Sequence, residues 1–207
     1  MTVSLEVISD VICPWCFIGK RRLEQAWAAI TPPVTVRWLP FQLNPGMPPE
    51  GIERREYRIR KFGSWERSRQ LDAQVAAVGR EVGIDFAFDK IARTPNTAAA
   101  HRLIAFAEPS GQQDAVVERL FQAYFVEGRD LCRRDTLLDL VAEAGVDRQA
   151  ALQALQERAV DDATREAQHL IARHQINGVP ALIINRQVFL SGAQEPATIL
   201  QAIRQAT

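Results

Sequence analysis

The sequence predicts an α/β fold in which a βαβ unit near the N-terminus and an αββα unit near the C-terminus are separated by a helical insertion. Alternating apolar and polar residues predict strands at residues 3–8 and 34–39, with a helical apolar pattern between them. Apolar runs at 181–184 and 188–190, joined by a short polar turn, predict a hairpin. From about residue 57 to 160 the strand pattern disappears and helical patterns follow one another. These observations favour one α/β unit assembled from both ends of the chain.

The first strand leads into a helix at the segment Cys13-Pro14-Trp15-Cys16. Pro14 suits the first helical position, because an N–H at that position would have no helical partner. Residues three apart face the same way on a helix, so the two sulfurs can reach each other. Cys13 is therefore expected at the helix N-terminus, with Cys16 one turn inside.

This placement predicts thiol–disulfide chemistry. Free N–H groups and the helix dipole stabilise an anion at a helix N-terminus, so Cys13 is expected to be the attacking thiolate and Cys16 the resolving thiol. The alternatives are half of a zinc site or two inert buried cysteines. Zinc needs four ligands, and only Cys132 and three scattered histidines remain, so no metal is expected.

The segment after the first helix is expected to border a ligand site. Thr31-Pro32-Pro33 predicts the end of that helix, and the second strand ends at Pro40-Phe41-Gln42-Leu43-Asn44-Pro45. Asn44 is interpreted either as a donor or acceptor for a substrate backbone or as a turn residue before Pro45. Residues 45–56 predict a boundary loop. The charged run at residues 53–61 is interpreted as a solvated helix face, with the steering of an acidic partner as the alternative.

The C-terminal part completes the α/β unit. A helix from about residue 161 precedes Gly178-Val179-Pro180 and the hairpin, and a last helix is expected to begin at Pro196. The order βαβ, insertion, αββα is that of a thioredoxin fold. Residues 1–44 and 161–207 are thus expected to form a thioredoxin-like domain, and residues 45–160 a helical insertion domain.

Several sequence blocks carry a resemblance to a known family. They run from Ser9-Asp10-Val11-Ile12-Cys13-Pro14-Trp15-Cys16 through residues 40–45, Asn96-Thr97 with Ala100-His101, Ala123-Tyr124-Phe125 and Gly178-Val179-Pro180 to Ser191-Gly192-Ala193-Gln194. The chain resembles the DsbA-like thioredoxin-fold oxidoreductases, in particular the FrnE-type branch. The resemblance implies a thioredoxin fold with an all-helical insertion and a dithiol–disulfide activity. A related branch, the kappa-class glutathione transferases and 2-hydroxychromene-2-carboxylate isomerases, lacks the dithiol pair that is present here.

The resemblance also implies roles for residues far from the cysteines. Pro180 would be cis and face the dithiol, leaving the backbone of Val179 free to pair with an extended substrate. His101 would lie on a helix near the cysteines, although the local pattern alone favours an ordinary core or surface histidine. Cys132 has no second cysteine at C-x-x-C spacing and is expected to be an ordinary loop thiol.

Residues 191–194 lie just before the last helix. N–H groups there are candidates to hold a substrate carboxylate, with Ser191 and Gln194 contributing, and simple capping is the alternative. Pro14 and Trp15 complete the expected substrate-binding surface.

Composition limits the kinds of partner. Lys and Arg total 25 and so do Asp and Glu, so no net charge favours nucleic acid or an anionic membrane surface. No apolar run reaches the roughly 18 residues of a membrane span, and the N-terminus does not read as a signal peptide. The protein is therefore expected in the cytoplasm. The oligomeric state is left open, a dimer included.

The function expected from these residues is exchange of protein or peptide disulfides through the Cys13/Cys16 dithiol, as a reductase or isomerase. No cofactor is expected beyond the redox-active disulfide, with glutathione as a candidate reductant or ligand. One alternative is a glutathione-dependent transferase or isomerase, in which Asn44 and residues 191–194 would bind the tripeptide and Cys16 would be dispensable. The other is a non-catalytic polypeptide-binding module that uses the groove near Trp15 and Val179.

Overall fold

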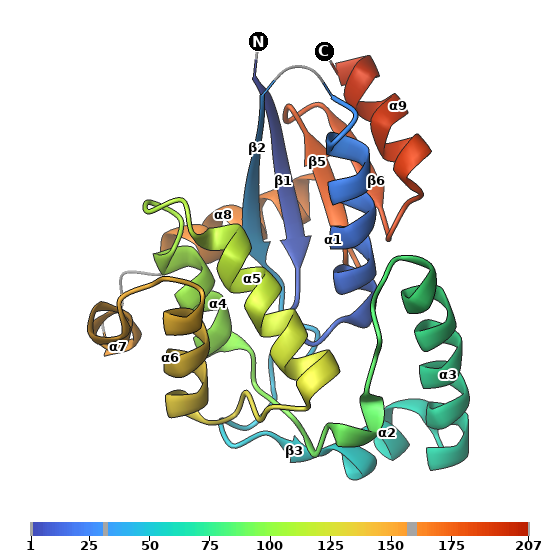
Figure 1. Ribbon diagram of the computed structural model, residues 1–207, viewed down its shortest axis with the longest axis vertical. Helices are drawn as coiled ribbons and strands as arrows, with labels where there is room; N and C mark the ends of the chain where they lie inside the picture. The colour runs from blue at the N-terminus through green and yellow to red at the C-terminus, as the bar shows by residue number, and fades with distance from the viewer. Residues whose placement is uncertain (1, 31–32, 157–160, 207) are drawn as a thin grey trace.

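A four-stranded mixed sheet forms the centre of the protein (Figure 1). The computed structural model describes residues 2–30, 33–156 and 161–206. The strands are β1 (Val3–Ser9), β2 (Val34–Pro40), β5 (Ala181–Ile184) and β6 (Val188–Ser191), in the spatial order β2-β1-β5-β6. β1 is parallel to β2 and antiparallel to β5, and β6 is antiparallel to β5. All four strands lie where the sequence predicts them.

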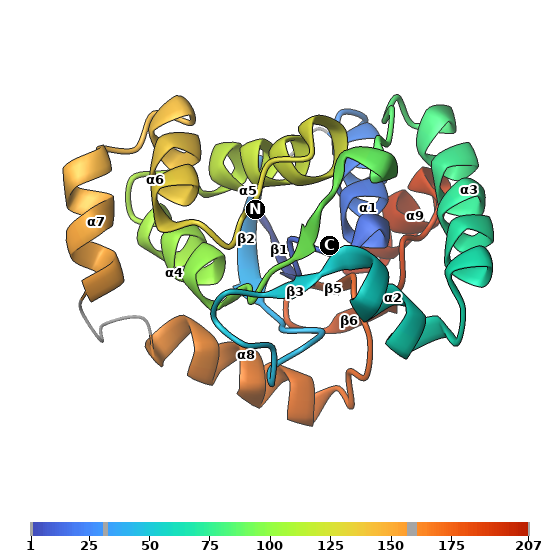
Figure 2. The same cartoon turned by 90° about the horizontal axis from the view of Figure 1, so that it is seen from below.

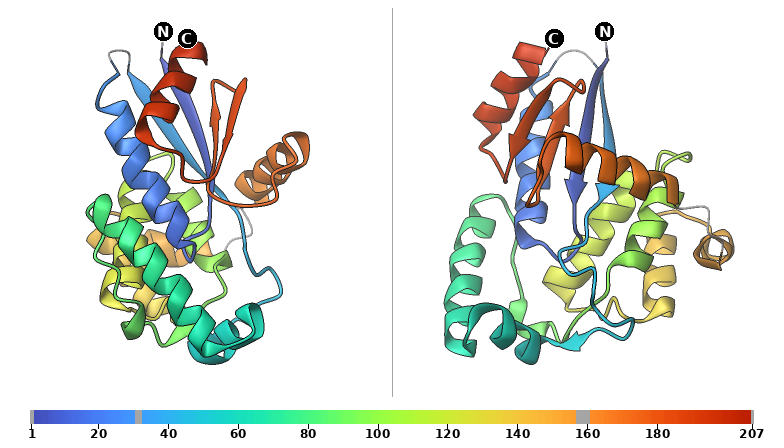
Figure 3. Two further views of the ribbon diagram at one scale, coloured as in Figure 1. Left: turned by 90° about the vertical axis from the view of Figure 1, so that its right-hand side faces the viewer. Right: turned by 180° about the vertical axis from the view of Figure 1, so that it is seen from behind.

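Helices cover both faces of this sheet (Figure 3). α1 (Pro14–Trp27) and α9 (Pro196–Ala206) pack on one face, and α8 (Asp161–Arg173) lies on the other. The alternation in β1 explains the two layers: Leu5 belongs to the large core cluster that includes residues of α1 and α9, whereas Ile8 packs with Leu170 of α8. The result is the thioredoxin arrangement with a helical insertion that the sequence predicts. The predicted helix end at Thr31-Pro32-Pro33 falls partly outside the described residues, and α1 itself ends at Trp27.

The segment between β2 and α8 forms most of the lower part of the molecule in Figure 1, the side from which Figure 2 is seen. Its elements are β3 (Ile52–Glu53), α2 (Arg54–Phe62), α3 (Trp65–Glu81), a short 3-10 turn (Phe88–Lys90), β4 (Arg93–Thr94), α4 (Ala98–Phe106), α5 (Gln113–Gln122), a π-helical turn (Ala123–Glu127), α6 (Arg134–Glu143) and α7 (Arg148–Gln156). The sequence predicts helices here but misses the pairing of β3 with β4, because two-residue strands leave no alternating pattern. The division into domains at residues 45 and 160 remains a prediction. No helix among the described residues is long and apolar enough to cross a membrane.

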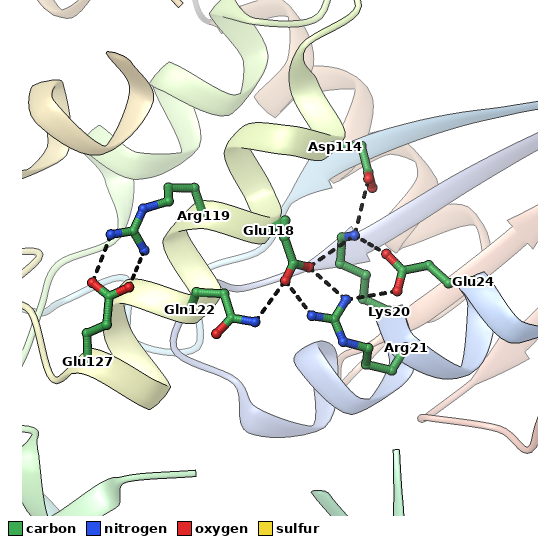
Figure 4. Close-up of polar contacts among 8 residues, drawn as sticks. All are labelled: Lys20, Arg21, Glu24, Asp114, Glu118, Arg119, Gln122 and Glu127. Atoms are coloured by element: carbon green, nitrogen blue, oxygen red, sulfur yellow. Dashed lines mark hydrogen bonds and ion pairs between the residues drawn. The ribbon is translucent and has the colours of Figure 1, made fainter. Parts of the chain in front are cut away.

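A network of charges joins α5 to α1, the helix that carries the cysteines (Figure 4). The Lys20 ammonium lies 3.1 Å from Asp114 Oδ2 and 3.2 Å from Glu118 Oε2, and it also contacts Glu24. Arg21 binds Glu118 through both of its terminal nitrogens. The side chain of Lys20 is only 2% exposed, so its charge depends on these carboxylates for compensation. This network fixes the insertion against the start of the thioredoxin-like unit.

Candidate active site

The two cysteines of the C-x-x-C motif lie at the turn from β1 into α1. The Cys13 N–H donates a hydrogen bond to the Asp10 carbonyl at 2.9 Å, which closes the turn, and Pro14 occupies the first helical position. The Cys13 carbonyl then accepts the Cys16 N–H at 3.0 Å. Both sulfurs are free thiols, and the residues are buried, at 5% and 1% exposure. The structure thus places the pair one helical turn apart, at the strand-to-helix junction that the sequence indicates.

The two sulfurs have different surroundings. Cys13 lines a cavity that is open to solvent, whereas Cys16 lies behind it in the core. Burial raises the pKa of the Cys16 thiol well above its usual range, and the neighbouring Cys13 and the charge of Asp10 raise it further. Cys16 therefore stays protonated at neutral pH, and Cys13 is the sulfur that a ligand in the cavity meets first.

The loop before β5 lies directly against Cys13. The Val179–Pro180 peptide bond is cis, and the Cys13 thiol contacts the Val179 carbonyl oxygen at 3.6 Å. On the other side, the Pro180 ring packs on α1 at Gly19, where an added Cβ would lie only 3.0 Å from Pro180 Cγ. A glycine at position 19 therefore lets the loop approach α1 closely. The structure brings together the Cys13/Cys16 pair and Val179-Pro180, as the sequence-based interpretation expects.

A buried acid lies beneath the motif. Asp10 is fully buried; its Oδ2 accepts the Leu43 N–H at 2.7 Å, and its Oδ1 lies 3.3 Å from His101 Nε2. His101 is itself only 6% exposed, on α4. The histidine thus contacts the loop that carries the cysteines through Asp10. The sequence singles out His101 but gives no role to Asp10, because the pair joins residues 91 positions apart.

The cavity beside Cys13 has a volume of about 390 Å³. It lies between three parts of the chain: the motif itself, the loop before β5, and the pair α2–α3 of the insertion. The residues on which its chemistry depends are Cys13, Trp15, Val179, Arg54, Tyr57, Arg58, Lys61 and Asp72. Trp15, at 41% exposure, is the large apolar side chain on its rim. The cavity thus offers a peptide-sized space next to a nucleophilic sulfur.

Three predicted binding residues lie outside this lining. Asn44 accepts a hydrogen bond from the Tyr57 hydroxyl at 2.8 Å, so it supports a wall of the cavity rather than facing a ligand. Gln194 donates to the Ser191 carbonyl at 2.6 Å, and this loop packs on the far side of Pro180, where the Gly192 N–H donates to the Pro180 carbonyl. The structure therefore does not bring Ser191 and Gln194 into the cavity beside Cys13. Binding roles for these residues stay predictions.

The basic face of α2 is the part of the site that the sequence-based interpretation misses. Arg54 is buried and Arg58 is half-buried. Both bind the carboxylate of Asp72 on α3, with Arg54 Nη2 at 2.8 Å from Asp72 Oδ2. Other residues of the charged run 53–61, such as Arg55 and Arg60, are exposed, so the prediction of a solvated helix face is correct for them. The spacing 54, 58, 61 places three basic side chains on one helical face, a signal that was present in the sequence.

The Cys132 thiol is free and half-buried, and burial with the nearby Asp130 raises its pKa to about 11.

Comparisons with known proteins agree with this architecture. A family model described as a DSBA-like thioredoxin domain matches residues 4–204. The uncharacterised protein YwbO of Bacillus subtilis (strain 168) is 28% identical over 194 residues, which are 93% of this chain and 92% of that protein. The crystal structure of a probable DsbA oxidoreductase from Streptomyces coelicolor is similar with a TM-score of 0.89 at 27% identity, covering 99% of this chain and 89% of that chain. The cytosolic disulfide reductase DsbM from Pseudomonas aeruginosa shares the fold, with a TM-score of 0.70 at 21% identity over 98% of this chain and 97% of that chain.

Proposed function

The chain belongs to the family of DsbA-like thioredoxin domains, and from this membership we propose that it is a thiol–disulfide oxidoreductase acting on peptide or protein disulfides through Cys13 and Cys16. The observation that carries the proposal is the unequal placement of the two thiols. Cys13 faces a cavity of about 390 Å³ beside Val179, and Cys16 lies buried one turn behind it. An attacking sulfur that lines the cavity and a resolving sulfur protected behind it are what a two-step exchange requires.

In the first step the Cys13 thiolate attacks one sulfur of a substrate disulfide. A Cys13–substrate disulfide forms, the substrate S–S bond breaks, and the departing sulfur leaves as a thiolate that takes up a proton. In the second step Cys16 loses its proton and attacks the Cys13 sulfur. The Cys13–Cys16 disulfide forms, and the second substrate sulfur leaves as a thiol. Two electrons and two protons have then passed to the substrate. Two external thiols, or one external dithiol, return the enzyme to the dithiol form and are themselves oxidised to a disulfide.

The loop before β5 is proposed to hold the substrate during this exchange. The Val179 carbonyl already contacts the Cys13 thiol, and no backbone partner is found for the Val179 N–H within residues 2–30, 33–156 and 161–206. An extended substrate segment lying along residues 178–179 would pair with this backbone and present its sulfur to Cys13. Trp15 and Pro14 would contact the substrate from the opposite rim.

We propose reduction or isomerisation as the direction of exchange, in the reducing environment of the cytoplasm. The dipeptide between the cysteines, Pro14-Trp15, contains no histidine whose charge would favour the thiolate, so a moderately reducing couple is expected. Glutathione is proposed as a reductant or a ligand. DsbM, at 20% identity, has been solved with GSH, an observation that belongs to that protein.

Turnover of a disulfide-linked peptide, measured with the variants Cys13→Ser, Cys16→Ser and Cys132→Ser, tests this function. We expect the first two variants to lose steady-state turnover and the third, which removes a thiol outside the cavity, to retain it. If Cys16→Ser keeps full activity with glutathione, the glutathione-dependent transferase or isomerase replaces this proposal. If the double variant Cys13→Ser/Cys16→Ser keeps biological activity and partner binding, the protein is a polypeptide-binding module.

A further inference from the structure

We propose that the basic face of α2, formed by Arg54, Arg58 and Lys61, is a carboxylate-binding subsite that selects acidic disulfide substrates. This inference rests on the proposed disulfide exchange at Cys13 and specifies its substrate class. The preferred substrate carries an acidic side chain close to the cysteine whose disulfide is attacked.

The basic face of α2 lies in the same cavity as the reactive sulfur. Arg54, Arg58 and Lys61 line the same cavity as Cys13, Trp15 and Val179. They lie on one face of α2 because their spacing follows the helical repeat. A substrate whose sulfur reaches Cys13 therefore has neighbouring residues within the same cavity as this positive face.

The charged side chains that line the cavity are predominantly basic. Asp72 is the one acidic residue among those that line it, against three basic ones. The side chains of Arg54 and Arg58 are only 7% and 14% exposed, and they share the two oxygens of this single carboxylate. One buried and one half-buried guanidinium group on a single carboxylate leave positive charge without a counter-ion, which is unfavourable for groups removed from water. A carboxylate from a substrate would supply the missing negative charge.

Two further observations agree with a shortage of acceptors at this place. The Arg54 Nε is buried and has no hydrogen-bond partner within the described residues. Burial lowers the pKa of Arg58, and the positive charge of Arg54 lowers it further despite the opposing effect of Asp72. Buried donors without acceptors are rare in proteins and call for an explanation. A ligand with carboxylate oxygens provides one.

A purely structural role for this cluster explains less. Asp72 with one arginine would already join α2 to α3 as a neutral pair, and Arg58 also donates to the Ser68 hydroxyl at 2.7 Å. The second guanidinium group and Lys61 add positive charge that is not required to hold α2 against α3. Lys61 donates to the Tyr57 hydroxyl at 2.8 Å, which does not neutralise its charge. The chain as a whole has no net charge, so this excess is local to the cavity.

The test compares kcat/KM for three peptide disulfides that differ only in the residue next to the cysteine, which is Glu, Gln or Lys. The wild-type protein is expected to prefer Glu over Gln by about fivefold and to disfavour Lys, with the preference falling as salt is raised. The variants Lys61→Gln and Arg58→Gln should reduce the Glu/Gln ratio towards one. Arg60→Gln is the matched control, since it removes the same charge from an exposed position on α2 outside the cavity.

A glutathione-containing mixed disulfide forms the second arm, because its carboxylates carry the same chemistry. A Lys61→Gln defect on the Glu peptide assigns the subsite to acidic side chains, and a defect only on the glutathione disulfide assigns it to the tripeptide. Two results would overturn the subsite. One is an equal kcat/KM for the Glu, Gln and Lys peptides together with no effect of Lys61→Gln on the peptide or glutathione disulfides, and the other is a loss of the Glu preference in Arg60→Gln equal to that in Lys61→Gln. In either case the measured turnover would still support the proposed function. Absence of turnover with every disulfide would instead remove the proposed function.

Discussion

The Cys13 sulfur lies 3.6 Å from the carbonyl oxygen of Val179, a residue 166 positions away in the chain. This contact joins the C-x-x-C motif at the start of α1 to the loop before β5. In the proposed exchange, a substrate sulfur bonded to Cys13 would lie beside the backbone of residues 178–179. The order of events at the two cysteines can be tested on this basis.

Replacing Cys16 by Ala is expected to trap the intermediate. The mixed disulfide between Cys13 and substrate would form but would not be resolved, because the resolving thiol is absent. Non-reducing mass spectrometry after mixing with a peptide disulfide should show about one peptide per protein. Cys132→Ala, which removes a thiol from outside the cavity, should show none at steady state. Product release from Cys16→Ala at the wild-type rate would contradict a resolving role for Cys16.

The resolving step is expected to accelerate with pH. Burial holds the pKa of Cys16 well above its usual value of 9.0, so at pH 7 to 8 only a small fraction is thiolate. Since the thiolate is the nucleophile, this fraction and the rate should rise about tenfold per pH unit below that pKa. Rapid-mixing measurements of mixed-disulfide decay between about pH 7 and 9 would check the slope. A rate independent of pH over that interval would mean that Cys16 is already ionised.

A histidine at position 15 is expected to make the couple more oxidising. Trp15 is partly exposed at the rim of the cavity, so its replacement leaves the core intact. A charged imidazole next to the thiolate would stabilise the reduced form, and a tenfold stabilisation corresponds to about 30 mV. Equilibration of Trp15→His and Trp15→Phe with glutathione measures the shift, and Trp15→Phe controls for loss of the indole. Equal potentials for the two variants would speak against a charge effect.

The network around Lys20 is expected to contribute strongly to stability. Lys20→Met would leave Asp114, Glu118 and Glu24 facing one another without the buried ammonium (Figure 4), and breaking a buried charge network typically costs about 3 kcal/mol. Arg119→Met removes pairings with Glu127 and Glu143 that are more exposed and should cost about 1 kcal/mol or less. Urea unfolding of both variants gives the comparison. If both variants lose a similar amount of unfolding free energy, the burial of Lys20 does not make its ion pairs more stabilising than exposed ones.

The sequence predicts the sheet and the position of the cysteines because both depend on local patterns. Alternation over β1 and β2 and the proline at the start of α1 act over a few residues, so they can be read without tertiary information. The inward face of α2 depends on Asp72 of α3, and the same charged run would be solvated without that partner. The role of Asp10 likewise depends on His101 of a distant helix. The loop that carries Gln194 is held by a hydrogen bond from the Gly192 N–H to the Pro180 carbonyl. This contact joins two separate parts of the hairpin region, so it could not be predicted from the helix N-terminus expected after residue 194.

The most direct test of the account is the redox equilibrium of Cys13 and Cys16 in glutathione buffers, followed by mass spectrometry. We expect an intramolecular disulfide, lighter than the dithiol by two hydrogens, with a reduction potential near that of thioredoxin, about −270 mV. That result would establish the dithiol couple as the working centre of a reductase. Persistent glutathionylation of Cys13 without a Cys13–Cys16 bond would contradict it and would favour a glutathione-dependent function.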